Sequence, residues 1–334
     1  MTKLSVLDLC PVNEGDSVAM ALGNSARLAA HAEQLGYNRF WLAEHHNMPG
    51  IASAATSVVI GHVAAATRSI RVGAGGVMLP NHSPLVIAEQ YGTLEALYPG
   101  RIDLGLGRAP GTDQPTMQAL RRSSSGTVDN FPGDVLELQK YLADTPTGTS
   151  GITATPGAGS KVPLWILGSS LYGAQLAAKF GLPYAFASHF APQMLEQALE
   201  VYRSNFKPSA QLDKPYVMLG FNICGSDTDA AAEYLASSGA QALRNLRYGR
   251  PGKLPPPVDG FVASLNPMER SMLAEMRKYS AIGSMDTMRR AIEEFIAKTE
   301  ADELMLAAHI FDQDARHRSY EMAAEIAGLQ QLAS

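Results

Sequence analysis

Residues 71–108 read RVGAGGVMLPNHSPLVIAEQYGTLEALYPGRIDLGLGR. An apolar, glycine-containing run is followed by a polar turn, a helical segment near Leu85–Leu97 and a second apolar run. Neither apolar run alternates with polar residues, as expected of parallel strands that are covered on both faces. This stretch therefore predicts a strand–helix–strand unit with two parallel strands.

The same alternation extends along the whole chain. The predicted strands are Leu4–Cys10, Arg39–His45, Arg71–Leu79, Ile102–Arg108, Leu164–Gly168, Tyr184–His189, Tyr216–Cys224 and Glu303–Ile310. The predicted helices are Val18–Leu35, Ala54–Ala66, Leu85–Leu97, Asn130–Leu142, Tyr172–Phe180, Pro192–Phe206, Thr228–Leu246, Asp286–Thr299 and Ala315–Leu332. This repetition predicts an α/β fold, either a (β/α)8 TIM barrel or a doubly wound open sheet. The even spacing favours the barrel, as a single domain over residues 1–334.

Two segments interrupt this rhythm. Gly107–Thr127 follows the fourth strand, and Gly249–Pro267 separates the seventh strand from the eighth. Insertions of this size in a compact domain are typically lids or binding loops. A plain surface excursion is the alternative. The shorter stretch Thr145–Gly159 is interpreted as a surface connection.

Composition excludes several classes of protein. The formal net charge is -5 and there is no basic stripe, so we expect no nucleic-acid partner. The longest stretch without charged residues, Asn47–Thr67, contains too many Gly, Ser and Pro residues for a membrane span. Met1–Asp8 lacks the apolar run of a signal peptide, and the chain has 2 cysteines. We expect a cytoplasmic protein with no membrane partner.

In a barrel, the active site lies at the C-terminal ends of the strands. The residues predicted at these ends are Asp8, Leu9, Cys10, Glu44, His45, His46, Gly75, Gly76, Val77, Met78, Gly107, Arg108, Gly168, Ser169, Ser170, Ser188, His189, Asn222, Cys224 and His309. Polar groups from several strands would thus meet at one mouth, as a ligand site requires.

The sharpest local signal is Gly168-Ser169-Ser170, directly before a predicted helix. A helix start of this kind offers backbone N–H groups, hydroxyl donors and the positive end of the helix dipole. Arg108 ends the neighbouring strand and could bind the same anion through its guanidinium. Ordinary capping by the serines is the alternative. Together with Arg108, the pattern favours a phosphate-bearing ligand.

His45 and His46 raise the question of a metal site. Adjacent strand residues point to opposite faces, and no Asp, Glu and His cluster at metal spacing is evident in the sequence. We therefore expect no metal ion. His45 is the better candidate for a proton donor or acceptor, because a histidine titrates near neutral pH.

Gly73, Gly75 and Gly76 lie within the third strand, where a side chain would normally help to fill the barrel. Glycines inside a strand indicate close approach of a ligand or of another backbone segment. A flat ring against the bare main chain and packing against a neighbouring strand both remain open. The neutral residues Met78, Leu79, Phe186 and Phe190 nearby suggest an apolar substrate.

Three segments carry a resemblance to a known family. Phe40–His46 resembles the second-strand motif Trp-Leu-x-Glu-His-His of the bacterial luciferase-like, flavin-dependent monooxygenases. Val72–Pro84 is similar to the third strand and exit loop of that family, and Gly100–Arg108 to its fourth strand. The resemblance covers nearly the whole chain.

This resemblance implies a (β/α)8 barrel that binds FMN, which a separate flavin reductase supplies in reduced form. Oxygen would add to the flavin as a C4a-hydroperoxide, which would oxygenate a small organic substrate such as an aldehyde. Members of the family are often dimers, so a homodimer is an expected assembly. The chemistry is carried by the cofactor, and the protein orients it and excludes water.

The resemblance also assigns roles to residues. His45 matches the catalytic histidine of the family, and Arg108 and Ser170 match residues that bind the FMN phosphate. Gly75-Gly76 falls on a peptide that is cis in the luciferase and lies beside the isoalloxazine ring. The expected cofactor-binding residues are therefore Gly75, Gly76, Arg108, Gly168, Ser169 and Ser170.

The chain also departs from the family pattern. Ser169 stands where the luciferase has a glutamate, and Gly173 stands where it has a threonine, so neither light emission nor its substrate is implied. Gly249–Pro267 corresponds roughly to the mobile lid of the family. Two other functions stay open: a deazaflavin-dependent oxidoreductase on the same barrel, and a non-catalytic flavin-binding protein.

Overall fold

Parallel strands close into a barrel because the last of them pairs with the first. The computed structural model describes residues 2–108, 114–120, 130–144 and 151–330. Within them the barrel strands, in order around the ring, are β1 (Lys3–Asp8), β2 (Arg39–Leu42), β3 (Arg71–Met78), β4 (Ile102–Gly107), β5 (Leu164–Gly168), β6 (Tyr184–Phe186), β7 (Val217–Gly225) and β9 (Glu303–Ala307). Pairing of β9 with β1 closes the ring, which confirms the TIM barrel and excludes the open sheet.

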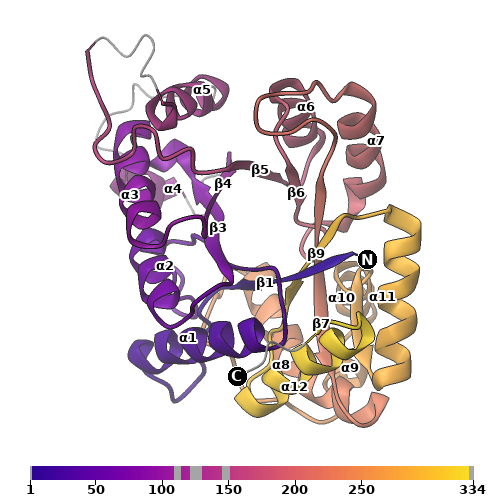
Figure 1. The fold of residues 1–334 in the computed structure, drawn as a ribbon. Coiled ribbons are helices and arrows are strands. Elements are labelled where there is room, and N and C mark those ends of the chain that lie inside the picture. The colour runs from indigo at the N-terminus through magenta and orange to yellow at the C-terminus, as the bar shows by residue number, and fades with distance from the viewer. Residues whose placement is uncertain (1, 109–113, 121–129, 145–150, 331–334) are drawn as a thin grey trace.

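Helices surround the ring of strands (Figure 1). They are α1 (Val18–Gln34), α2 (Thr56–Ala65), α3 (Pro84–Leu97), α4 (Gln114–Leu120), α5 (Phe131–Leu142), α6 (Leu171–Phe180), α7 (Leu195–Asn205), α8 (Asp229–Arg247), α9 (Phe261–Ser264), α10 (Pro267–Met276), α11 (Met285–Thr299) and α12 (Gln313–Ile326). Short 3-10 turns occupy Leu79–Asn81 and Pro192–Met194. None of the helices in the described ranges combines the length and apolarity needed to cross a membrane.

One strand, β8 (Ser280–Gly283), and three helices, α4, α9 and α10, were not predicted from the sequence. β8 pairs with the last residues of β7, whereas β6 and β9 pair with the earlier part of β7. The four residues of β8 are at the lower limit of the length over which strand alternation can be recognised. The start of α10 did carry a signal, because Asn266 and Glu269 form a capping box.

Several predicted strands extend too far toward the mouth of the barrel. β2, β6 and β9 end at Leu42, Phe186 and Ala307, whereas the predicted strands run on to His45, His189 and Ile310. The residues that follow have turned out of the ladder into the loops that line the mouth. The predicted loop Gly107–Thr127 lies largely outside the described residues, apart from Gly107, Arg108 and α4.

The predicted insertion Gly249–Pro267 is packed across one side of the mouth. Leu254 N–H donates to Val12 O at 2.9 Å. Gln241 of α8 donates to Pro256 O at 2.9 Å. The segment is therefore held between the loop after β1 and the helix α8, so it is not a plain surface excursion.

A layer of buried charges fills the N-terminal end of the barrel. The Arg39 guanidinium donates to Asp103 at 2.6 Å and to Glu303 at 2.8 Å, and all three side chains are buried. Trp41 Nε1 also donates to Asp103, at 3.1 Å, and the Tyr216 hydroxyl donates to Glu303 at 2.9 Å. A buried charge needs a paired, hydrogen-bonded partner. Since Arg39 lies on β2 and its partners lie on β4 and β9, the network holds these three strands together through their side chains.

A layer of indole rings lies above these charges. Trp41 and Trp165 meet edge to face with their ring centroids 5.1 Å apart. The Arg39 guanidinium lies 4.8 Å from the Trp165 ring centroid, so the charged layer and the aromatic layer are in contact. Leu7 and Met305 belong to the same interior cluster as the tryptophans.

The network predicts a large loss of stability on removal of one buried carboxylate. Asp103→Ala leaves Arg39 with only one of its two buried carboxylates, and we expect unfolding to require about 3–5 kcal/mol less. Asp144→Ala is the control, because Asp144 pairs with Lys161 on the surface, where both side chains are about two-thirds exposed. Its expected cost is below about 1 kcal/mol. Urea unfolding measures both, and equal losses would contradict the assignment.

Candidate functional site

One cavity of about 1020 Å³ opens at the C-terminal ends of the barrel strands. It is lined by every residue predicted for the site, namely His45, Gly75, Gly76, Arg108, Gly168, Ser169 and Ser170. His45, Arg108, Ser169 and Ser170 follow β2, β4 and β5, Gly168 ends β5, and Gly75 and Gly76 lie within β3. These four strands are neighbours in the barrel. The strand-end rule therefore selected side chains that share one cavity.

Other strand-end residues face away from this cavity. The predicted mouth residues that do not line it are Asp8, Cys10, Glu44, His46, Val77 and Ser188. Alternate side chains of a strand point to opposite faces, so only half of each strand end can reach the mouth. Asp8, for example, forms a buried ion pair with Arg316 of α12 at 2.6 Å. Leu79 and Phe186 also lie in the outer core, whereas Met78 and Phe190 line the cavity.

The end of the cavity near β4 and β5 is suited to an anion. The Arg108 guanidinium lies over the Tyr172 ring, 4.2 Å from its centroid, which holds the charge at the cavity wall. Ser170 is the N-cap residue of α6, but its side chain makes no capping hydrogen bond. The Ser170 hydroxyl therefore does not cap the helix, contrary to the alternative of ordinary serine capping. A Cβ at Gly173 would lie 3.3 Å from Tyr184, so a larger residue would be crowded there.

Packing inside the barrel accounts for the glycines of β3. A Cβ on Gly75 would lie 2.8 Å from a methyl carbon of Leu7, and one on Gly76 would lie 2.8 Å from the carbonyl oxygen of Gly105. The packing alternative thus explains why no side chain is present. The Gly75-Gly76 peptide is cis, as the resemblance implied, and its backbone borders the cavity. The wall at this point is bare main chain.

Three uncharged histidines line the cavity. Burial lowers the pKa of His45, and it lowers the pKa of His309 to about 4 with a contribution from Arg316. Burial, together with His309 and His45, lowers the pKa of His189 to about 3. All three imidazoles are therefore neutral at pH 7 and able to accept or donate a hydrogen bond.

His189 and Asn222 present polar atoms that no group in the described part of the chain satisfies. These atoms are His189 Nδ1 and Asn222 Oδ1. Asn222 Nδ2 donates to His189 O at 2.8 Å, which fixes the loop after β6 beside β7. A Cβ on Gly220 would lie 1.9 Å from His189 Nδ1, so the ring occupies the space that a side chain would need.

Glu44 joins two histidines next to His45. The Nε2 atoms of His46 and His82 each lie 2.8 Å from Glu44 Oε1, and Met78 N–H donates to Oε2 at 3.1 Å. Burial raises the pKa of Glu44, but these hydrogen bonds lower it by more. The pKa therefore lies below its ordinary value, and the carboxylate stays ionised. The cluster ties the end of β2 to the exit of β3.

The same three side chains correct the expectation that no such cluster exists. Ligand atoms of Glu44, His46 and His82 lie within 4.8 Å of one another, a spacing that could hold a metal ion. Sequence reasoning missed the cluster because His82 is 38 residues from Glu44, and the pairing of β2 with β3 brings them together. Both imidazoles are hydrogen-bonded to the Glu44 carboxylate in the structure.

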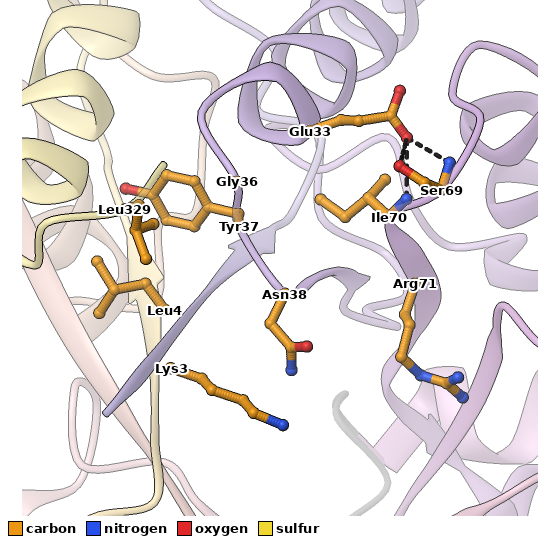
Figure 2. A pocket seen from close by; sticks show the side chains of 10 residues that line it. All are labelled: Lys3, Leu4, Glu33, Gly36, Tyr37, Asn38, Ser69, Ile70, Arg71 and Leu329. Carbon is orange, nitrogen blue, oxygen red and sulfur yellow. Dashed lines mark hydrogen bonds between the residues drawn. The ribbon is translucent and has the colours of Figure 1, made fainter. Parts of the chain in front are cut away.

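A second cavity, of about 360 Å³, lies at the opposite end of the barrel (Figure 2). Glu33 accepts the backbone N–H groups of Arg68 and Ile70 at 2.9 Å each and so caps the turn before β3. Arg71, on the same cavity wall, is bound to Asp103. Its polar groups thus serve the barrel structure, as is typical of the N-terminal face of this fold.

Sequence reasoning missed the wall formed by α8. Its cavity-lining residues are Ala236, Gly239, Ala240, Ala242, Leu243, Leu246 and Arg247. The pattern predicted an amphipathic helix but could not tell whether its apolar face covers the barrel or a cavity. Tyr172, which holds Arg108, was assigned only to the start of a helix.

Comparisons with known proteins agree with this geometry. The family model "Luciferase-like monooxygenase" matches residues 3–325. A luciferase-like monooxygenase of Escherichia coli strain K12 is 54% identical over 322 residues, which cover 96% of each chain. The N-acetyl-S-alkylcysteine monooxygenase of Bacillus subtilis is 37% identical over 218 residues, 64% of this chain and 65% of that one. The crystal structure of apo-MsnO8 has a TM-score of 0.88 at 36% identity and covers 99% of this chain and 100% of that chain.

The lowered pKa of His189 predicts a specific loss of stability in acid. Its pKa of about 3 lies below its ordinary value of 6.5, so the unfolded chain takes up the proton first. The free energy of unfolding is therefore unaffected above pH 6.5 and falls as the pH drops from about 6.5 toward 3.

His189→Asn should remove the part of this fall that His189 contributes, so the slope between pH 7 and about 4.5 becomes shallower, while His45 and His309 keep their contributions. Urea unfolding at each pH measures the slope. His62→Asn is the control, because His62 is exposed on α2, and it should keep the wild-type pH dependence. A variant at position 189 that keeps the full wild-type slope would show that His189 titrates normally.

Proposed function

The chain belongs to the luciferase-like monooxygenase family, and we propose that it uses reduced FMN and O2 to oxygenate a small, largely apolar organic substrate. One observation carries the proposal. A single cavity joins a cationic, hydroxyl-bearing end, a wall of bare backbone and neutral histidines. These are the groups that a phosphorylated, planar cofactor needs.

The residues fit the phosphate of FMN. Arg108 supplies a guanidinium that Tyr172 orients, and no carboxylate of the described residues pairs with it. Ser170 keeps its hydroxyl and stands at the positive end of α6. Ser169 in place of a glutamate removes a negative charge from this position, which suits an anion.

The cis Gly75-Gly76 peptide offers a side-chain-free surface for the isoalloxazine ring. When bound, reduced FMN supplies the electrons that activate O2. His45 lies at the same cavity and, being neutral, can hold or accept a proton there. Glu44, next to His45, holds the end of β3 and the loop that follows it in place through hydrogen bonds with Met78 N–H and His82.

The remaining lining supports an apolar substrate and exclusion of water. Leu7, Met78, Leu167 and Ile282 are among the many apolar residues around the cavity. Water exclusion protects reactive oxygen chemistry from side reactions. The Bacillus subtilis relative is named for a thioether substrate, so thioethers join aldehydes as substrates to screen. We also propose that a separate reductase delivers the reduced FMN.

An isotope experiment tests the reaction class. Protein, FMN, a flavin reductase and NADH are incubated under 18O2 with a panel of aldehydes and thioethers. The expected product carries one 18O atom, because a monooxygenase transfers one atom of O2 to its substrate. Substrate conversion without 18O, or conversion under anaerobic conditions, would refute the monooxygenase proposal and favour hydride transfer.

A variant tests the phosphate site. Arg108→Ala should weaken binding of FMN about tenfold to a hundredfold, because a charge-assisted hydrogen bond contributes about 1.5–3 kcal/mol. Riboflavin lacks the phosphate and should bind with unchanged affinity. Fluorescence titration measures both flavins. Equal weakening of the two would mean that Arg108 is structural and the phosphate is bound elsewhere.

A further inference from the structure

The wall formed by α8 is an apolar stripe that ends in a cation. Ala236, Ala240 and Leu243 recur at helical spacing and face the cavity, and Arg247 lies in the last turn. From Ala236 to Arg247 the helix rises about 16 Å, at 1.5 Å per residue. This stripe could accommodate an extended apolar chain of that length.

The charges at the cavity are all of one sign. Among the described lining residues, the charged side chains are Arg108, Arg247 and Arg277, with no aspartate, glutamate or lysine. Arg277 is neutralised by Glu233 at 2.7 Å. Arg108 is assigned above to the FMN phosphate. Arg247 is therefore the cation that remains for a second ligand.

The described residues around Arg247 orient its guanidinium without neutralising it. Its carbon Cζ lies 5.7 Å from the ring centroid of Phe190, and Nη2 lies 3.3 Å from Met276 Sδ. An aromatic face and a thioether are weak acceptors and carry no net charge, so most guanidinium donors stay available. Phe190 directly follows His189, whose Nδ1 has no hydrogen-bond partner among the described residues.

We propose that Arg247 binds an anionic group of the substrate, so that the substrate is an apolar molecule with one terminal carboxylate. The carboxylate pairs with the guanidinium at the mouth, and the apolar part lies along the stripe of α8 toward the Gly75-Gly76 wall. This inference rests on the proposed function, because a flavin phosphate at Arg108 is what leaves Arg247 for the substrate. A guanidinium matches a carboxylate in two parallel hydrogen bonds.

The test compares a carboxylate with its neutral amide. Octanoate and octanamide are titrated into the wild-type protein by calorimetry, without FMN and with saturating FMN. The wild type should bind octanoate about tenfold more tightly than octanamide in both conditions. The expected preference is modest because Arg247 is exposed and solvent screens its charge.

Variants identify the residue responsible. Arg247→Gln should remove the preference by weakening octanoate alone, and Arg247→Lys should restore part of it. Arg250→Gln is the matched control, because Arg250 is exposed three residues further on and does not line the cavity. It should keep the full preference. Unchanged melting temperatures show that the variants are folded.

Results that differ from these expectations would overturn the inference or the proposed cofactor. Equal affinity of the wild type for the two probes, or a preference that survives Arg247→Gln, overturns the inference. A preference lost in Arg108→Gln instead shows that the carboxylate occupies the phosphate end, which also overturns it. Absence of FMN binding, with the preference intact and dependent on Arg247, would refute the proposed cofactor but still support Arg247 as the carboxylate-binding residue, so the two failures can be told apart.

Discussion

Arg39 places a positive charge inside the barrel between the carboxylates of Asp103 and Glu303, and the rest of the interior is built on this pairing. Because a buried charge without its partner is very costly, the three strands that carry these residues cannot shift independently. The charged layer supports the rings of Trp41 and Trp165, and the cavity lies beyond them. The position of the cavity walls thus depends on contacts at the far end of the strands.

Stability and ligand binding are separated along the barrel axis. At the N-terminal end, polar side chains are bound to one another, as in the contacts of Arg71 and Glu33. At the C-terminal end, Arg108, Arg247 and His189 keep unsatisfied capacity for charge or hydrogen bonding. The insertion Gly249–Pro267 completes the cavity on the side that the barrel strands leave open. Function can therefore vary at one end while the other end maintains the fold.

The sequence predicted the barrel because parallel strands buried on both faces read as apolar runs of even spacing. It also predicted His45, Arg108 and Ser170 at one cavity, because strand ends meet at one edge of the barrel. The direction of side chains at and just after the end of a strand was not predicted, and Asp8 and Glu44 point away from the cavity. Long-range pairing was equally inaccessible, since nothing local marks His82 as a neighbour of Glu44. The inward face of α8 has the same composition as an ordinary packing face.

The contact between Gly220 and His189 has an evolutionary consequence. Any side chain at position 220 would occupy the space of the imidazole nitrogen, which lies 1.9 Å from where a Cβ would be. The two positions are thus coupled: a relative with a larger residue at 220 must replace the histidine or turn its ring away. Since that ring borders the cavity, substitution within the strand would remodel the ligand-facing surface without changing any residue that contacts a ligand.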